Sequence, residues 1–152
     1  MEPRTHNATQ ALKDFMQPQG TPVLCSETPL FLIQSSGDWL YEGSALPKKF
    51  AKLFASILHC DNDDYFLITP VEKVRVEVED VPLIIVDFSH DSNTGLLAVR
   101  SSIDTEHLQI DSKQMRITDF GIYLPLERGL WGKLSRACYY NFVNEFNLSN
   151  EN

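Results

Sequence analysis

Residues 39–80 read WLYEGSALPKKFAKLFASILHCDNDDYFLITPVEKVRVEVED, and this stretch decides the fold class. Its first half has the pattern of an amphipathic helix. Pro47 suits the first turn of a helix, where its missing N–H is not needed. The apolar residues that follow recur at the spacing of a single helix face: Phe50, Leu53, Phe54, Ile57 and Leu58. The pattern predicts a central helix over about residues 47–59.

The second half of this stretch has the pattern of a half-buried strand. Between residues 73 and 79 (KVRVEVE) valines alternate with charged residues, so the valines share one face and the charges share the other. One apolar and one charged face are typical of an antiparallel sheet with one side in water. Similar short runs predict a hairpin over 30–42 and strands at 65–69, 83–88, 96–101, 107–110 and 121–124.

The ends of the chain are predicted to contain helices. Residues 1–22 form an N-terminal segment with a short helix over 9–16, and the wide apolar arc of residues 130–146 predicts a C-terminal helix. Residues 102–120 show no clear period. Short strands with segregated helices predict an α+β protein with a mostly antiparallel sheet. Residues 23–148 then form a single compact unit, and the alternative is two closely packed lobes that divide near 88–95.

Length and composition exclude several classes of protein. The chain has 152 residues and a formal net charge of −8, which argues against nucleic-acid binding because that needs a basic face. No apolar run approaches the roughly 18–20 residues of a membrane-spanning helix, and the polar start shows no secretory signal. The three cysteines lie far apart, which fits a reducing compartment. We therefore expect a soluble, cytoplasmic protein with no nucleic-acid or membrane partner.

The same central stretch carries a family resemblance. The strings WLYEGS (39–44), KLFASIL (52–58), TPVEKV (69–74) and VEDVP (78–82) occur in order, and weaker matches follow at 128–130 and 136–140. With these motifs, residues 24–143 resemble a bacterial family known as domain of unknown function 1285. The family commonly has Asp-Gly before the aromatic strand, where this chain has Asp63-Asp64. The resemblance implies a roll-like β portion and a second α/β portion, and it implies no activity.

The acidic turn at 61–64 suggests a calcium loop, but its spacing argues against one. Asp61, Asp63 and Glu72 fall at positions one, three and twelve of such a loop. Position six must be glycine for the sharp bend, and Phe66 stands there. The neighbouring His–Cys pair at 59–60 has no second pair nearby to complete a four-ligand zinc site. We expect no metal and no other cofactor.

Carboxylates of the 72–80 segment are the candidates for catalysis. Glu77 and Glu79 lie on one face of the predicted strand, about 7 Å apart by strand geometry, which allows acid–base chemistry. A solvated strand face has the same composition, and this is the alternative. The sequence has no nucleophile elbow and no glycine-rich phosphate loop. If the protein is an enzyme, it is a hydrolase or transferase of unidentified type that uses Glu72 and Glu77.

The start of the predicted central helix is unusually basic. Lys48, Lys49 and Lys52 lie there without an acid, although positive charge at a helix N-terminus opposes the helix dipole. Because this end of a helix attracts anions, the lysines predict a docking point for a phosphate, a carboxylate or an acidic partner surface. The alternative is that Asp38 or Glu42 neutralises them.

Aromatic residues and arginines complete the predicted ligand site. An apolar pocket with a polar anchor is typical of small-molecule sites, although buried aromatics equally close a core. The candidates are Tyr41, Arg75, Arg128 and Tyr139. We favour a non-enzymatic module that binds a small anionic ligand or a protein partner, as a monomer or a homodimer. A flat basic patch with an apolar border would support the module, and a pocket that gathers Glu72, Arg75 and a tyrosine would support the enzyme.

Overall fold

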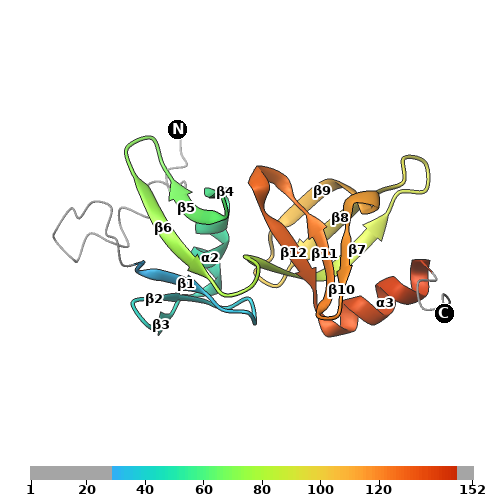
Figure 1. The fold of residues 1–152 in the computed structure, drawn as a ribbon, viewed down its shortest axis with the longest axis horizontal. Helices are drawn as coiled ribbons and strands as arrows, with labels where there is room; N and C mark the ends of the chain where they lie inside the picture. The colour runs from blue at the N-terminus through green and yellow to red at the C-terminus, as the bar shows by residue number, and fades with distance from the viewer. Residues whose placement is uncertain (1–28, 147–152) are drawn as a thin grey trace. The chain divides into compact units, whose positions relative to one another are not determined.

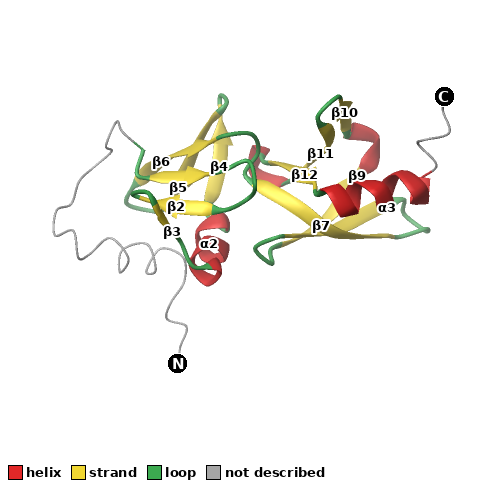
Figure 2. Ribbon diagram, turned by 90° about the horizontal axis from the view of Figure 1, so that it is seen from below, coloured by secondary structure: helices red, strands yellow, loops and turns green. Residues whose placement is uncertain are grey.

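The computed structural model describes residues 29–146, which form two compact units that divide between Asp80 and Val81 (Figure 1). The sequence analysis gave a single unit, with two lobes that divide near 88–95 as the alternative, and the observed division precedes that stretch. The predicted helix over 9–16 lies outside the described residues. Figure 2 shows that each unit combines a twisted sheet with an α-helix. No helix within residues 29–146 is long and apolar enough to cross a membrane.

The first unit is built on a sheet with the strand order β3-β2-β1-β6-β5-β4. The predicted hairpin over 30–42 and the alternating strand over 73–78 are confirmed, since they form β1, β2 and β6. The helix α2 packs on the sheet, with the ring of Phe54 5.5 Å from that of Phe31. The elements are β1 (Phe31–Ile33), β2 (Trp39–Tyr41), β3 (Ser44–Ala45), α2 (Lys48–Ala55), β4 (Leu58–Asp61), β5 (Asp64–Ile68) and β6 (Lys73–Val78).

The second unit is built on a sheet with the order β10-β11-β12-β7-β8-β9. The stretch 102–120, which showed no period, contains β9, a 3-10 turn and β10. The elements are β7 (Leu83–His90), β8 (Leu96–Ser101), β9 (Glu106–Asp111), η2 (Ser112–Gln114), β10 (Arg116–Thr118), β11 (Gly121–Pro125), η3 (Glu127–Gly129), β12 (Trp131–Leu134) and α3 (Arg136–Phe146).

The two sheets follow the same path. In each, the first strand lies in the middle, and the next two are added outward on one side. The chain then crosses to the other edge and returns inward, so that the sixth strand lies parallel to the first. The α+β class is confirmed. Most strand pairs are antiparallel, as predicted, but both sheets are mixed because of the parallel pairs β1–β6 and β7–β12.

The central helix is shorter than the predicted 47–59. It ends at Ala55, where the N–H of Ser56 donates to the carbonyl of Leu53 and the N–H of Ile57 donates to that of Phe54, both at 3.1 Å. Leu58 begins β4 instead and is fully buried opposite its partner in β5. A helix and a strand both place this leucine in the core, so the apolar spacing alone did not separate them.

The acidic turn at 61–64 joins two strands, not a helix and a strand. Asp61 pairs with Asp64, and the residues between them, Asn62 and Asp63, have φ values of 55° and 71°. Two central residues with positive φ are typical of a tight β-hairpin turn. Because Asn and Asp tolerate this conformation, the hairpin forms here without glycine.

The C-terminal helix is also shorter than the predicted 130–146. Trp131–Leu134 form the strand β12, which pairs with both β11 and β7, and α3 begins at Arg136. The side chain of Ser135 accepts a bond from the N–H of Cys138 at 3.2 Å, an arrangement typical of a helix start. Beyond this point the predicted apolar face is present, because Cys138 and Phe142 are buried.

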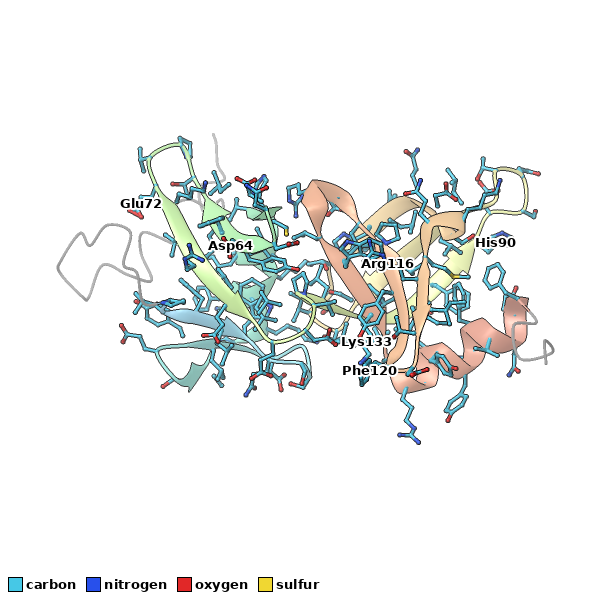
Figure 3. The ribbon with its side chains drawn as sticks, in the orientation of Figure 1. Asp64, Glu72, His90, Arg116, Phe120 and Lys133 are labelled. Carbon is cyan, nitrogen blue, oxygen red and sulfur yellow. The ribbon has the colours of Figure 1, made fainter. Side chains whose placement is uncertain are left out.

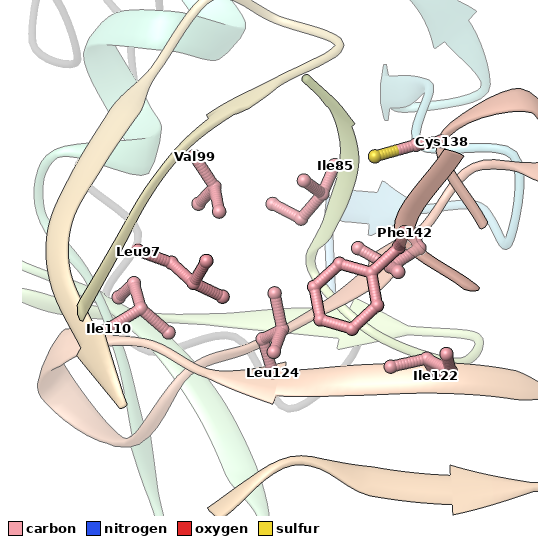
Figure 4. Close-up of a cluster of buried hydrophobic side chains, with 9 residues drawn as sticks. Ile85, Leu97, Val99, Ile110, Ile122, Leu124, Cys138 and Phe142 are labelled. Carbon is pink, nitrogen blue, oxygen red and sulfur yellow. The ribbon is translucent and has the colours of Figure 1, made fainter. Parts of the chain in front are cut away.

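The core of the second unit lies between its strands and α3 (Figure 4). It contains nine buried residues. They are Ile85, Leu97, Val99, Ile110, Ile122, Leu124, Leu134, Cys138 and Phe142.

Gly132 in β12 is a position at which this core has no room for a side chain. A Cβ there would lie 2.9 Å from two side-chain carbons of Ile85 and 3.2 Å from one of Leu126. We expect Gly132→Ala to lower the free energy of unfolding by about 1–3 kcal/mol, because the core becomes overpacked. Chemical denaturation measures this loss. Adding Ile85→Val removes the Cδ1 atom and should recover part of it, and a double variant without recovery would contradict the proposed clash.

Candidate functional site

The three lysines predicted to bind anions are exposed on α2. Its first turn contains no acid, and Pro47 provides no side-chain cap. Lys49 lies with its Nζ 5.3 Å from the centroid of the Phe50 ring. Asp38, one of the acids expected to neutralise this region, accepts a hydrogen bond from the hydroxyl of Ser36 at 3.0 Å. The lysine residues, Lys48, Lys49 and Lys52, thus form a basic surface on the first unit.

Arg75 on β6 is already engaged by an acid. Its guanidinium lies 3.3 Å from the carboxylate of Asp64 and 5.3 Å from the ring centroid of Phe66. The candidate catalytic residues are both exposed, Glu72 in the turn before β6 and Glu77 on β6 itself. The hydroxyl of Thr69 accepts a hydrogen bond from the N–H of Glu72 at 2.9 Å, and this bond stabilises the turn. Figure 3 labels Glu72.

Tyr41 and Arg75 do not line a common pocket, contrary to the sequence analysis. Tyr41 is buried with its ring 4.9 Å from that of Phe31, and burial raises its pKa. Phe31 also pairs with Val76, which is buried in the same core. Because neighbouring side chains alternate between the faces of a strand, Arg75 points to the opposite side of the sheet.

The other two predicted ligand residues belong to the second unit. Tyr139 on α3 packs against the core of this unit, with its ring 5.4 Å from that of Tyr140. Arg128 in η3 lies 3.4 Å from the carboxylate of Glu127 and has a positive φ of 58°. Each of the two residues therefore has a packing or charge partner within its own unit.

A buried histidine joins three parts of the second unit, and the sequence analysis did not find it. His107 is 4% exposed, and its Nδ1 lies 2.8 Å from an oxygen of Glu127. Because a carboxylate only accepts hydrogen bonds, Nδ1 carries the proton. The Nε2 atom lies 2.8 Å from the hydroxyl of Thr105, which in turn lies 2.6 Å from the hydroxyl of Ser101.

This chain of hydroxyl, imidazole and carboxylate has the order of a catalytic relay, but its contacts are those of a structural network. Ser101 is fully buried and accepts the N–H groups of Ile103 and Thr105. The hydroxyl of Thr105 is held on both sides, by Ser101 and His107. The network therefore ties the turn after β8 and the strand β9 to η3.

Glu127 makes the stability contributed by this hydrogen-bond network depend on pH. The hydrogen bond from His107 is the main cause that lowers its pKa, against the opposing effect of burial. A lowered carboxyl pKa stabilises the fold above the pKa of the unfolded chain, about 4.3, and this contribution is lost as the pH falls through the folded-state value. We expect Glu127→Gln to destabilise the protein at pH 7 and to differ less from the wild type below about pH 4.

The check is chemical denaturation of both proteins at a series of pH values between 7 and 3. Glu145→Gln, which changes an exposed carboxylate on α3, is the matched control and should give a small, pH-independent difference. A Glu127→Gln penalty that stays constant down to pH 3 would contradict the assigned hydrogen bond.

Three neighbouring strands of the second unit carry two cations held over aromatic rings. Arg116 on β10 lies with its Cζ 4.5 Å from the ring centroid of Trp131 on β12. Lys133 on β12 lies with its Nζ 5.7 Å from the ring centroid of Tyr123 on β11. Such distances are those of cation–π contacts. We call these four residues the cation–aromatic face.

The register of the sheet explains why the four side chains meet. Tyr123 pairs with Arg116 on one side and with Lys133 on the other. Its neighbours Ile122 and Leu124 are buried in the core, so the side chain of Tyr123 points away from the core. None of the residues in β10, β11 or β12 is acidic.

An exposed aromatic residue borders the cation–aromatic face. Phe120 is 79% exposed in the β10–β11 turn (Figure 3). Ile117 on β10 pairs with the buried Ile122 and therefore lies on the other face of the sheet. At Gly121 an added Cβ would lie 3.1 Å from the Cε of Lys133, so the lysine stem passes closely over this glycine. The face thus combines fixed cations with exposed apolar surface, a composition typical of interaction sites.

The other half of the same sheet, β7–β9, has a different charge arrangement. Arg100 on β8 pairs with Asp87 at 3.3 Å and with Asp104 at 3.5 Å. A shallow hollow of about 200 Å³ lies beside it on β7–β9, with Glu106 and Leu108 in its lining. Arg100 is therefore a neutralised arginine in the same sheet, and it offers a matched comparison for Arg116.

Fold and surface together define a two-unit α+β protein with a cluster of exposed lysines in its first unit and the cation–aromatic face in its second. A model of the "Domain of unknown function (DUF1285), N-terminal domain" matches residues 19–81. The solved structure of a DUF1285 family protein from Shewanella baltica OS155 is 68% identical to this chain, with a TM-score of 0.77, and the match covers 84% of this chain and 100% of that one. The chain belongs to the DUF1285 family.

A more distant solved structure shares the fold. It is a DUF1285 family protein from Silicibacter pomeroyi DSS-3, with 24% identity and a TM-score of 0.64. The match covers 76% of this chain and 68% of that chain. None of the proteins with curated functions matches the chain. The family resemblance of the sequence is therefore confirmed, and the function of the family is unknown.

Proposed function

We propose that this chain is a non-enzymatic binding module that recognises a small anionic ligand or an acidic partner surface. The observation that carries the proposal is the cation–aromatic face, where two cations are held over rings on strands that contain no acid. The exposed ring of Phe120 beside this face supports a protein partner.

The charges on the first unit support the same kind of partner. Lys48, Lys49 and Lys52 are exposed on α2, whose first turn contains no acid. Favourable interaction with an anion would offset their unfavourable position near the start of the helix. This basic surface is the second candidate for the anion site, and the binding experiment distinguishes it from the cation–aromatic face.

The alternative, a hydrolase or transferase that uses carboxylates of the 72–80 segment, has less support. Glu72 lies in a tight turn and Glu77 on an exposed strand face. The nearest arginine on the same strand, Arg75, is paired with Asp64. A nucleophile with an adjacent base is the usual mark of such enzymes, and neither glutamate has one among its described hydrogen-bond partners.

Binding of fluorescein-labelled poly-L-glutamate to the full chain, followed by fluorescence anisotropy at 50 and 150 mM salt, tests the proposal. We expect Arg116→Gln/Lys133→Gln to weaken binding about tenfold or more, because each charge-assisted hydrogen bond contributes roughly 1.5–3 kcal/mol. Arg100→Gln, which changes an arginine that is already neutralised, should bind as the wild type does.

Two outcomes would change the assignment. If Lys48→Gln/Lys49→Gln/Lys52→Gln weakens binding and the Arg116/Lys133 variant does not, the anion site lies on α2. If no variant alters binding, or the wild type binds no polyglutamate at either salt concentration, the binding proposal is wrong.

A further inference from the structure

We propose that Arg116 is a preorganised carboxylate receptor, and that the partner of the cation–aromatic face is an acidic polypeptide segment. This inference rests on the proposed binding function and specifies its ligand class. It begins with the position of the guanidinium. Arg116 belongs to the edge strand β10 and is exposed, yet its Cζ lies 4.5 Å from the ring centroid of Trp131, two strands away.

The stack on Trp131 prepares the guanidinium for one type of ligand. A planar guanidinium that lies on a ring keeps the N–H groups along its edge directed outward, and this fork matches the two oxygens of a carboxylate. Within residues 29–146, Arg116 has no carboxylate partner, whereas Arg75, Arg100 and Arg128 each have one. The edge donors of Arg116 are thus available to a ligand.

The ring beneath the guanidinium is itself fixed by the sheet. Trp131 is half-buried and pairs with Pro125 on β11, and the next residue, Gly132, packs against Ile85 in the core. The strand that carries Trp131 has neighbours on both sides, β11 and β7. Arg116 therefore rests on a rigid support, which lowers the conformational entropy that binding would cost.

A second cation on the same face extends the site beyond one carboxylate. Lys133 lies across β11 from Arg116, since Tyr123 pairs with both. Two strand spacings separate the backbones of the two cations, roughly 10 Å. An extended polypeptide advances roughly 3.3 Å per residue, so acidic side chains about three residues apart span this distance.

The rings distinguish a polypeptide from a single-stranded nucleic acid. Proteins that bind single strands leave aromatic faces open for the bases to stack on. Here Arg116 lies over Trp131 and Lys133 over Tyr123, so a base would first have to displace a cation. The net charge of −8 also opposes a dense line of phosphates. The exposed Phe120 beside the face instead fits the apolar side chains of a polypeptide.

The experiment measures the affinity of the full chain for two labelled probes, poly-L-glutamate and a dT oligonucleotide, at 150 mM salt. We expect wild-type protein to prefer polyglutamate. Arg116→Lys keeps the charge and loses the fork, and it should weaken polyglutamate binding about fivefold to tenfold. Trp131→Leu should do the same, because it removes the support beneath the guanidinium.

The double variant Arg116→Lys/Trp131→Leu shows whether the two residues act as one unit. If they do, it should bind about as weakly as either single variant, because interacting residues are not additive. Arg100→Lys is the matched control and should be unchanged. Thermal unfolding confirms that each variant is folded.

The outcomes separate this inference from the proposed function. If Arg116→Lys binds polyglutamate as the wild type does, while Arg116→Gln/Lys133→Gln does not, the face is an anion site but the preorganised receptor is wrong. A preference for the oligonucleotide would overturn the polypeptide assignment. If wild-type protein binds neither probe, both the inference and the proposed function fail.

Discussion

Phe142→Ala is expected to lower the free energy of unfolding of the second unit by about 3–5 kcal/mol, because it leaves a large cavity in a closed core. Phe142 is 0% exposed, and its ring lies 5.1 Å from that of Phe88 and 4.5 Å from that of Phe146. With Cys138, it is one of the two residues of α3 that are buried in the core against the strands (Figure 4). Its loss therefore weakens both the core and the attachment of α3.

Native-state hydrogen exchange of the amides in β7 and β8 measures this loss, because the exchange rate of an amide reports the free energy needed to open the structure around it. Phe146→Ala is the matched control, on the same helix and one turn further along. Phe146 is partly buried at the edge of the same cluster, so its loss should cost less than half as much as that of Phe142. Equal losses for the two variants would show that Phe142 is not the centre of this core.

The sequence predicted the strands better than the helices. The alternation over 73–78 identifies a strand because a period of two is typical of no other element. The runs at 83–88 and 96–101 do not alternate, but they are short, apolar and separated by a turn, which is typical of strands. The predicted end of the central helix was wrong at Leu58, and the predicted start of the C-terminal helix was wrong at Trp131. Both residues fit the apolar stripe of a helix, but each begins a strand. Pairing with neighbouring strands decides these positions, and one sequence contains no record of that pairing.

The candidate site shows the same limit. The basic start of α2 could be read from local sequence, since the lysines lie within five consecutive residues after Pro47. The cation–aromatic face could not, because Arg116 and Trp131 are fifteen positions apart in sequence and meet only across β11. Two of its strands had also been missed: β10 lies in the stretch without a period, and β12 had been predicted as helix.

His107 was missed for a different reason. A single histidine in a polar stretch carries no signal by itself, and its partner Glu127 lies twenty residues further along. The two residues meet because β9 contacts β11 in space and η3 follows β11 in sequence. Buried polar networks of this kind depend on tertiary packing, so their residues appear in sequence as ordinary surface types.

Phe54→Ala is expected to lower the free energy of unfolding of the first unit by about 3–5 kcal/mol. The residue is 0% exposed on α2, and its ring makes an edge contact with that of Phe31 at 5.5 Å. This contact joins the helix to the central strand β1. Because α2 has only eight residues and no side-chain cap, packing supplies most of its stability.

Phe50→Ala on the same helix is the matched control for this prediction. Its ring stacks on that of Phe54 at 6.5 Å but is partly exposed, so its loss removes less buried surface and should cost about half as much or less. Hydrogen exchange of the amides in β1 and β6 measures both variants, since these strands form the middle of the first sheet. A Phe50→Ala variant that opens the sheet as readily as Phe54→Ala would mean that the exposed end of the apolar stripe, and not Phe54, attaches α2 to the sheet.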